Sequence, residues 1–195
     1  MRLPEVVLRF LRIVPAVLAV SLGLTAAYSD YSSVKEKLSR IESDRLPAGS
    51  RVDLSAPELN AYVEREVAGV TDGVRNPKLE LLGPEMARGT AQVDFAKVRR
   101  SQGHPPGWLM SKLLEGERPV TVTARIRSGG GSATVTVQRV EISGLAIDGK
   151  TLDFLVQNCL LPLYPNATVN RPFSLGHRIQ KLDIQASGVK VLIGR

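Results

Sequence analysis

A long, unbroken alternation of apolar and polar residues constrains the fold of this chain more than any other feature. Over residues 120–127 every second residue is Val, Ala or Ile, and Thr or Arg stands between them. Glycines at 129–131 supply a turn, and the alternation returns over 133–137. Because successive side chains of a strand point to opposite faces, this pattern predicts an antiparallel hairpin with one apolar face. A change of parity after residue 137 predicts a bulge near Gln138–Arg139.

Shorter alternating runs predict further strands around residues 79–81 and 91–96, and at 182–186 and 189–193. A polar patch with Val34, Leu38 and Ile41 at helical spacing precedes the strands at 31–43, and two apolar helical patches interrupt them at 105–114 and 151–161. No regular alternation of strands and helices and no internal repeat is visible. The sequence therefore predicts an α+β fold with an antiparallel sheet.

The clearest helix begins at Ser55. Ser55 and Glu58 have the spacing of a capping box, in which each side chain accepts a hydrogen bond from the other residue's backbone N–H. Leu54 and Leu59 occupy the positions of a hydrophobic staple. Apolar residues at helical spacing then continue to residue 70, opposite a charged face. We expect a helix of about four turns that buries one face.

The first 27 residues have the composition of an export signal. A basic head with three Arg precedes an apolar run over residues 13–27 that ends in small residues. The run is short for a membrane-spanning helix, which needs about 20 residues, and Pro15 and Gly23 weaken it further. A cleaved signal peptide, a retained N-terminal membrane anchor and a soluble amphipathic helix are the alternatives.

The chain is therefore expected to have three parts. Residues 1–27 are the signal peptide or N-terminal membrane anchor, 28–49 a polar helical stalk or linker, and 50–195 a single α+β domain. A signal peptide or an anchor would both place the body of the protein on the far side of the membrane.

Composition excludes several classes of protein. One Cys rules out a disulfide framework, and together with two His it leaves too few ligands for a zinc site. The formal net charge is +7, but the basic residues are interspersed with acidic ones, so we expect no nucleic-acid partner. The charge is interpreted as a solvated surface or, alternatively, as affinity for anionic lipid headgroups or an anionic envelope polymer. We expect neither a metal nor a cofactor.

The sequence contains no catalytic signature. Ser132 lies in a predicted turn without the Gly-x-Ser-x-Gly motif of a nucleophile elbow. His104 and His177 are interpreted as loop residues, and Cys159 as a buried thiol on an apolar helix face. A Cys159–His177 nucleophile pair would need an orienting group and an exposed thiolate. We therefore expect a protein that is not an enzyme.

The string from Leu54 to Tyr62, which follows the export segment, resembles the opening of exported bacterial proteins similar to the tubular lipid-binding (TULIP, SMP/BPI-like) superfamily. The Val/Thr hairpin, the apolar helix before residues 162–165 and the string at 172–175 fit the same pattern. This resemblance covers residues 50–195. It implies a curved antiparallel sheet packed around a long helix, with one or two additional short helices. It also implies an apolar channel for acyl chains. The export segment, in turn, predicts a location that is periplasmic or tethered to the outer side of the inner membrane.

These observations lead to the hypothesis of an exported, non-catalytic cell-envelope protein that binds lipid or another amphiphile in a groove between sheet and helix. Its N-terminal segment would contact the membrane, and an envelope protein is a further possible partner. One alternative is an envelope scaffold or protein-interaction domain with a closed core, and another is an envelope hydrolase that uses Cys159 and His177. The expected groove lining is Leu59, Tyr62, Val63, Val67, Val93, Phe95, Val120, Val122, Ala124, Ile126, Ala133, Val135 and Val137.

Overall fold

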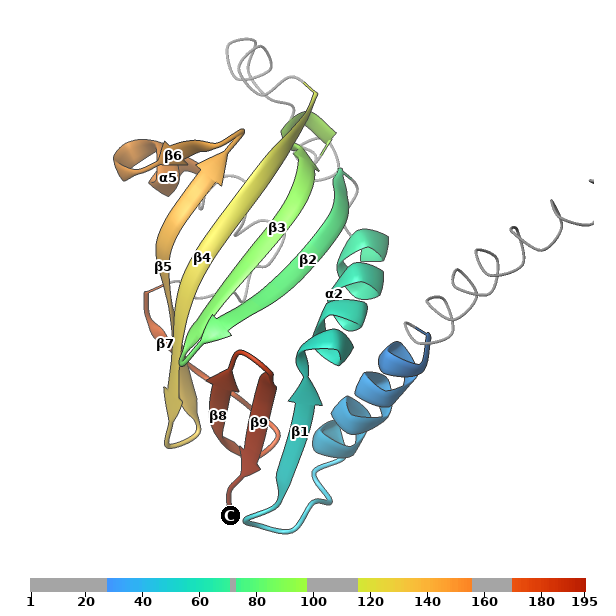
Figure 1. Ribbon diagram of the computed structural model, residues 1–195. Helices are drawn as coiled ribbons and strands as arrows, with labels where there is room; N and C mark the ends of the chain where they lie inside the picture. Colours follow the sequence, from blue (N-terminus) through green and yellow to red (C-terminus); the bar gives the residue numbers. More distant parts are fainter. Residues whose placement is uncertain (1–27, 71–72, 98–115, 156–169) are drawn as a thin grey trace, which may run out of the picture.

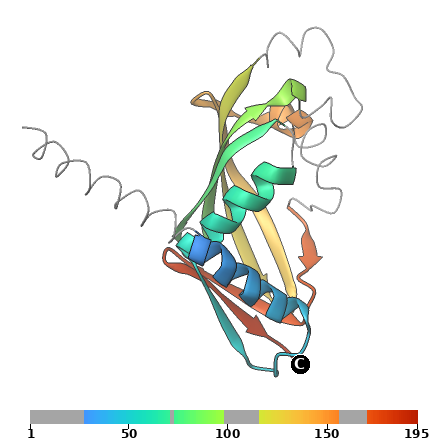
Figure 2. The ribbon, with the colours of Figure 1, turned by 90° about the vertical axis from the view of Figure 1, so that its right-hand side faces the viewer.

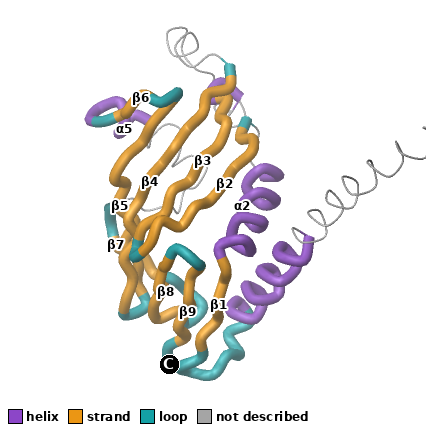
Figure 3. The backbone as a smooth tube through the Cα atoms, viewed as in Figure 1, coloured by secondary structure: helices purple, strands orange, loops and turns teal. Residues whose placement is uncertain are grey.

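A computed structural model describes residues 28–70, 73–97, 116–155 and 170–195 of the chain. Within these ranges the fold is mixed α+β, and strands make up most of it (Figure 3). Residues 28–42 form a first helix, which we call the N-terminal helix. The elements that follow it are β1 (Arg51–Ser55), α2 (Ala56–Val70), β2 (Val74–Gly83), β3 (Met86–Asp94), β4 (Glu117–Gly129), β5 (Ser132–Ile142), β6 (Leu145–Ile147), α5 (Gly149–Leu155), β7 (Pro172–Ser174), β8 (Ile179–Gln185) and β9 (Gly188–Ile193).

The strands form two antiparallel sheets (Figure 1). The large sheet has the order β2-β3-β4-β5-β6, with β7 also paired to β5, and it is visibly curved in Figure 2. The small sheet has the order β1-β9-β8 and joins two segments from opposite ends of the chain. The sheets are connected at β4 and β8, where Ser128 Oγ donates to the Leu182 carbonyl oxygen (2.9 Å) and accepts from the Leu182 N–H (2.8 Å).

The predicted long hairpin is confirmed as β4 and β5. Ile126 pairs with Val135 and Ala124 pairs with Val137, so these apolar residues share one face of the sheet. The predicted bulge is confirmed as well, because the register shifts next to Ala124 and leaves Gln138 without a partner. Period-two alternation therefore located both the hairpin and its irregularity.

The apolar face continues from β4 onto β3 and β2. Ala87 of β3 pairs with Ala124 of β4 on one side and with Leu81 of β2 on the other. Leu81 and Ala87 are buried in a cluster with Ile184 of β8. The end of the large sheet that is nearest to β8 therefore forms part of the core.

The predicted start of α2 is confirmed. The Ser55 N–H donates to Glu58 Oε2 (2.7 Å), and the Glu58 N–H donates to Ser55 Oγ (3.3 Å), which is the geometry of a capping box. Beyond this cap, Asn60 Oδ1 accepts a hydrogen bond from the Leu79 N–H of β2 (2.9 Å). The first turns of α2 are therefore fixed to β1 at one end and to β2 along one side.

The N-terminal helix differs from the expected stalk. Val34 is fully buried and Ile41 is 4% exposed, and both belong to a core cluster with residues of β1 and β9. The sequence predicted the helical spacing of Val34, Leu38 and Ile41 correctly. It did not show which surface these three side chains cover. That surface is the apolar face of the small sheet, to which Val52 and Val191 contribute.

Several expectations fall outside the described residues. These are the export segment, the helix over 105–114 with His104 before it, and Cys159. Of the helix expected over 151–161, the described part is included in α5. Among the helices that the structure describes, none combines the length and the hydropathy needed to cross a membrane.

Candidate functional site

An apolar cavity of about 340 Å³ lies where the N-terminal helix, α2 and the two sheets meet. The N-terminal helix contributes Leu38 and Ile41 to its wall, and α2 contributes Leu59. The large sheet adds residues from three neighbouring strands, which are Leu79, Leu81, Ala87 and Ile126. The cavity is therefore assembled from elements at both ends of the sequence.

The small sheet forms the opposite wall. Its lining residues come from all three of its strands, and they are Leu54, Ile179, Leu182, Ile184, Val189 and Val191. Leu54, Ile184 and Val191 are at most 5% exposed, so this part of the wall is closed to solvent. Alternation places these side chains on one face of the sheet, which is the face that the N-terminal helix also covers.

Two polar residues line the cavity, Glu42 and His177, and both are exposed. They mark the mouth, where the cavity meets solvent. His177 Nδ1 lies 3.5 Å from the Asp44 carboxylate, and Arg178 donates to the carbonyl oxygens of Asp44 (3.2 Å) and Leu46 (3.3 Å). These contacts hold the β7–β8 loop against the segment that follows the N-terminal helix. His177 lies in an exposed loop, as the sequence predicted.

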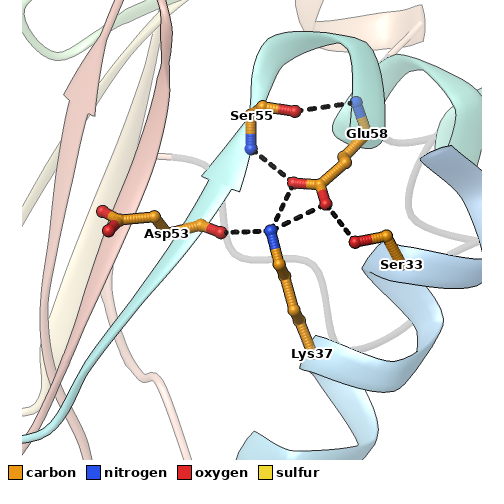
Figure 4. Close-up of polar contacts among 5 residues, drawn as sticks. All are labelled: Ser33, Lys37, Asp53, Ser55 and Glu58. Carbon is orange, nitrogen blue, oxygen red and sulfur yellow. Dashed lines mark hydrogen bonds and ion pairs between the residues drawn. The ribbon is translucent and has the colours of Figure 1, made fainter.

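A buried carboxylate fastens the N-terminal helix to the rest of the fold (Figure 4). Glu58 is 5% exposed and accepts hydrogen bonds from Lys37 Nζ (2.7 and 2.8 Å) and from Ser33 Oγ (2.5 Å), as well as from the Ser55 N–H. Lys37 Nζ also donates to the Asp53 carbonyl oxygen (2.8 Å). Three elements therefore meet at one side chain.

The charge of Glu58 is stabilised despite its burial. Burial by itself raises the pKa of a carboxyl group, because the charged form loses its hydration. Here the hydrogen bonds from Lys37, Ser33 and the Ser55 N–H outweigh that effect and lower the pKa to about 2. Glu58 is consequently ionised at neutral pH and keeps its ion pair with Lys37.

A second polar cluster fastens the same helix to α2. Tyr31 Oη donates to Glu66 Oε1 (2.6 Å), and Lys35 Nζ lies 3.3 Å from the same oxygen. The hydrogen bond from Tyr31 lowers the pKa of Glu66. The Arg65 guanidinium lies 4.6 Å from the centre of the Tyr31 ring, in cation–π geometry. The two clusters hold Leu38 and Ile41 in the cavity wall.

Of the thirteen residues expected to line the site, the structure brings two, Leu59 and Ile126, together in the cavity. The side chain of Val67 lies outside the described residues. Ala133 and Phe95 are buried, at 2% and 7% exposure, and Tyr62 packs against the core cluster of the small sheet. The remaining expected residues are half-buried and do not line the cavity: Val63, Val93, Val120, Val122, Ala124, Val135 and Val137.

Sequence reasoning missed the wall formed by the N-terminal helix and the small sheet. The signals were present, since Leu38 and Ile41 have helical spacing and the last two strands alternate. The pairing of β1 with β9 was not visible, because a period-two pattern identifies the buried face of a strand but not its neighbour.

Within the described ranges, no group of three or more His, Cys, Asp and Glu side chains could hold a metal ion. Ser132 begins β5 directly after the hairpin turn. Cys159, the other half of the hydrolase alternative, lies outside the described residues.

Comparisons with known proteins add no functional information. A scan against protein-family models, a search of curated proteins and a search of solved structures each found no match. The similarity to the tubular lipid-binding superfamily therefore rests on the sequence pattern alone.

Proposed function

We propose that this protein is a non-catalytic, exported cell-envelope protein that binds a lipid or another amphiphile. The observation that carries the proposal is the cavity of about 340 Å³ with its aliphatic wall. Small-molecule sites in proteins have volumes of roughly 300–1,000 Å³ and are lined mainly by apolar side chains. The cavity meets both criteria.

The chemistry of the wall selects for an apolar ligand. Burial of apolar surface contributes about 25 cal/mol per Å² to binding, whereas a polar group without a hydrogen-bond partner costs about 1–3 kcal/mol. Apart from Glu42 and His177 at the mouth, the described lining residues have aliphatic side chains, which offer no such partner. An alkyl chain satisfies this wall, and a sugar or a nucleotide does not.

The proposal gives α2 a defined role. In it, the curved large sheet lies around α2, and α2 forms one wall of the binding site through Leu59. The support for this arrangement is the contact of α2 with β2 through Asn60 and the packing of Leu59 beside Leu79 and Ile126 at the cavity.

Location follows from the N-terminal sequence. The basic head and the apolar run of residues 1–27 support export, and the protein would then be periplasmic or tethered to the outer side of the inner membrane. In the tethered form, the N-terminal helix would be the first folded element beyond the membrane segment. Cell fractionation with and without residues 1–27 tests this part. Retention of the full chain in the cytoplasm would contradict it.

The binding proposal is tested by native mass spectrometry of the full chain isolated gently from envelope fractions. We expect a co-purified amphiphile in the wild type. Ile126→Trp, which fills the cavity, should lose this ligand, while Val122→Trp, on the same strand and face but outside the cavity, should retain it. Circular dichroism establishes that each variant is folded. Absence of any amphiphile from the wild type would favour the scaffold alternative with a closed core.

A further inference from the structure

The interior of the cavity has a uniform chemistry. Its described wall contains Leu, Ile, Val and Ala side chains, and Glu42 and His177 are confined to the mouth. No Phe, Tyr or Trp is among the described lining residues, and the one ring there, the His177 imidazole, lies at the mouth, so the interior offers no flat surface to a ring system. The wall suits a flexible saturated chain better than a planar molecule.

The volume limits how much of a lipid can enter. At about 340 Å³ the cavity is at the lower end of the range for ligand sites, roughly 300–1,000 Å³. At equal chain length, a two-chain lipid brings twice the apolar volume of a single-chain amphiphile. The second chain would stay outside this aliphatic wall.

The walls are fixed on several sides, so the cavity does not widen easily. Ser128 and Leu182 exchange two hydrogen bonds between the large and the small sheet. Glu58 and Glu66 fasten the N-terminal helix through Lys37 and Tyr31. Because both sheets and the helix are tied to one another, a larger occupant would have to break several of these contacts at once.

The mouth carries charges of both signs. Glu42 and Asp44 are acidic, while Arg178 is basic and binds the carbonyl oxygens beside them. His177 pairs with Asp44 at 3.5 Å. A polar head placed here stays in water beside groups of either charge, so the mouth discriminates little between anionic and zwitterionic heads.

On the premise of the proposed function, we infer that the cavity binds one chain of a single-chain amphiphile. The chain lies between Leu59 and Ile126 on one side and Val191 on the other, and the polar end lies at Glu42 and His177. The number of chains determines binding, and the head group contributes little. A free fatty acid and a lysophospholipid are both ligands of this class, and a diacyl phospholipid is not.

The test uses the full chain in nanodiscs of a diacyl phosphatidylcholine, analysed by native mass spectrometry after release from the disc. Palmitic acid or a lysophosphatidylcholine with the same 16-carbon chain is added in separate experiments. We expect one molecule of either compound per chain, with similar occupancy, and no retained diacyl lipid. Occupancy should fall at least about tenfold in Ile126→Trp and remain unchanged in Val122→Trp.

A second variant covers the case in which Ile126→Trp does not fold. Ala87→Leu fills only part of the volume that an alkyl chain would occupy in the cavity. It should therefore shift the preferred ligand from 16-carbon to shorter fatty acids. Retention of diacyl lipid by the wild type, or unchanged chain-length preference in Ala87→Leu, would overturn the single-chain inference while leaving the proposed function intact. Failure to retain any amphiphile would overturn the proposed function itself.

Discussion

At the scale of single residues, Glu58 is the group whose ionisation contributes most clearly to the fold. Its pKa is lowered from 4.5 to about 2 by hydrogen bonds to its charged form. A carboxyl with a lowered pKa stabilises the folded state above its unfolded-state pKa and loses that contribution as the pH falls through the folded value. The contribution of Glu58 is therefore complete above about pH 4.5 and disappears towards pH 2.

Glu58→Gln should lower the free energy of unfolding by about 2–3 kcal/mol at pH 7, because Lys37 loses its ionised partner. The difference from wild type should shrink as the pH falls from 4.5 towards 2. Urea unfolding at a series of pH values measures this. The control is Glu64→Gln on the exposed face of α2, for which we expect little change. Equal effects of the two substitutions would show that the Glu58 cluster does not stabilise the fold.

Gly188 is required by a close approach of two backbones. A Cβ at this position would clash with the Leu54 carbonyl oxygen and lie 3.1 Å from Ser55 Cα, at the junction of β1 and α2. We expect Gly188→Ala to lower stability by about 1–3 kcal/mol, since backbone has to move. Gly129→Ala is the matched control, because a Cβ there meets nothing within 4 Å. Thermal unfolding of both variants tests this expectation. Equal melting temperatures for Gly188→Ala and Gly129→Ala would contradict the close approach of β9 to β1.

At the scale of elements, the N-terminal helix is the part whose observed role differs most from the role that the sequence predicted. Val34→Asp should lower the free energy of unfolding by about 2–4 kcal/mol, because it replaces a fully buried side chain with an unpaired charge. Ser32→Asp introduces the same carboxylate on the exposed side of the helix and should be nearly neutral. Denaturant unfolding of both variants measures this difference in the free energy of unfolding. If neither substitution affected stability, residues 28–42 would be a stalk after all.

Local pattern and long-range pairing differed in how far they could be predicted. The β4–β5 hairpin, its bulge and the capping box of α2 follow from residues close in sequence, and each was found. The small sheet and the packing of Val34 depend on segments more than a hundred residues apart, and propensity contains no information about such pairs. The cavity could not be located for the same reason, although Leu59 and Ile126, which line it, were both among the residues expected to line a groove.

At the scale of the whole molecule, the cavity is where the two sheets and two of the helices come together. Each of these elements has an apolar face, and none of the four fills the space alone. Apolar surface that stays in contact with water in such an open cavity forgoes about 25 cal/mol of stabilisation per Å². A ligand that fills it adds stability in proportion to its affinity and concentration. If the proposed lipid binds there, the bound form would therefore be the more stable one.

The most direct test of this account is a crystal structure of the full chain with a 16-carbon fatty acid. We predict electron density for a single alkyl chain inside the cavity, between Leu59, Ile126 and Val191, with the carboxylate at the mouth beside Glu42 and His177. Side chains that close the cavity completely, or fatty acid bound only outside it, would contradict the account.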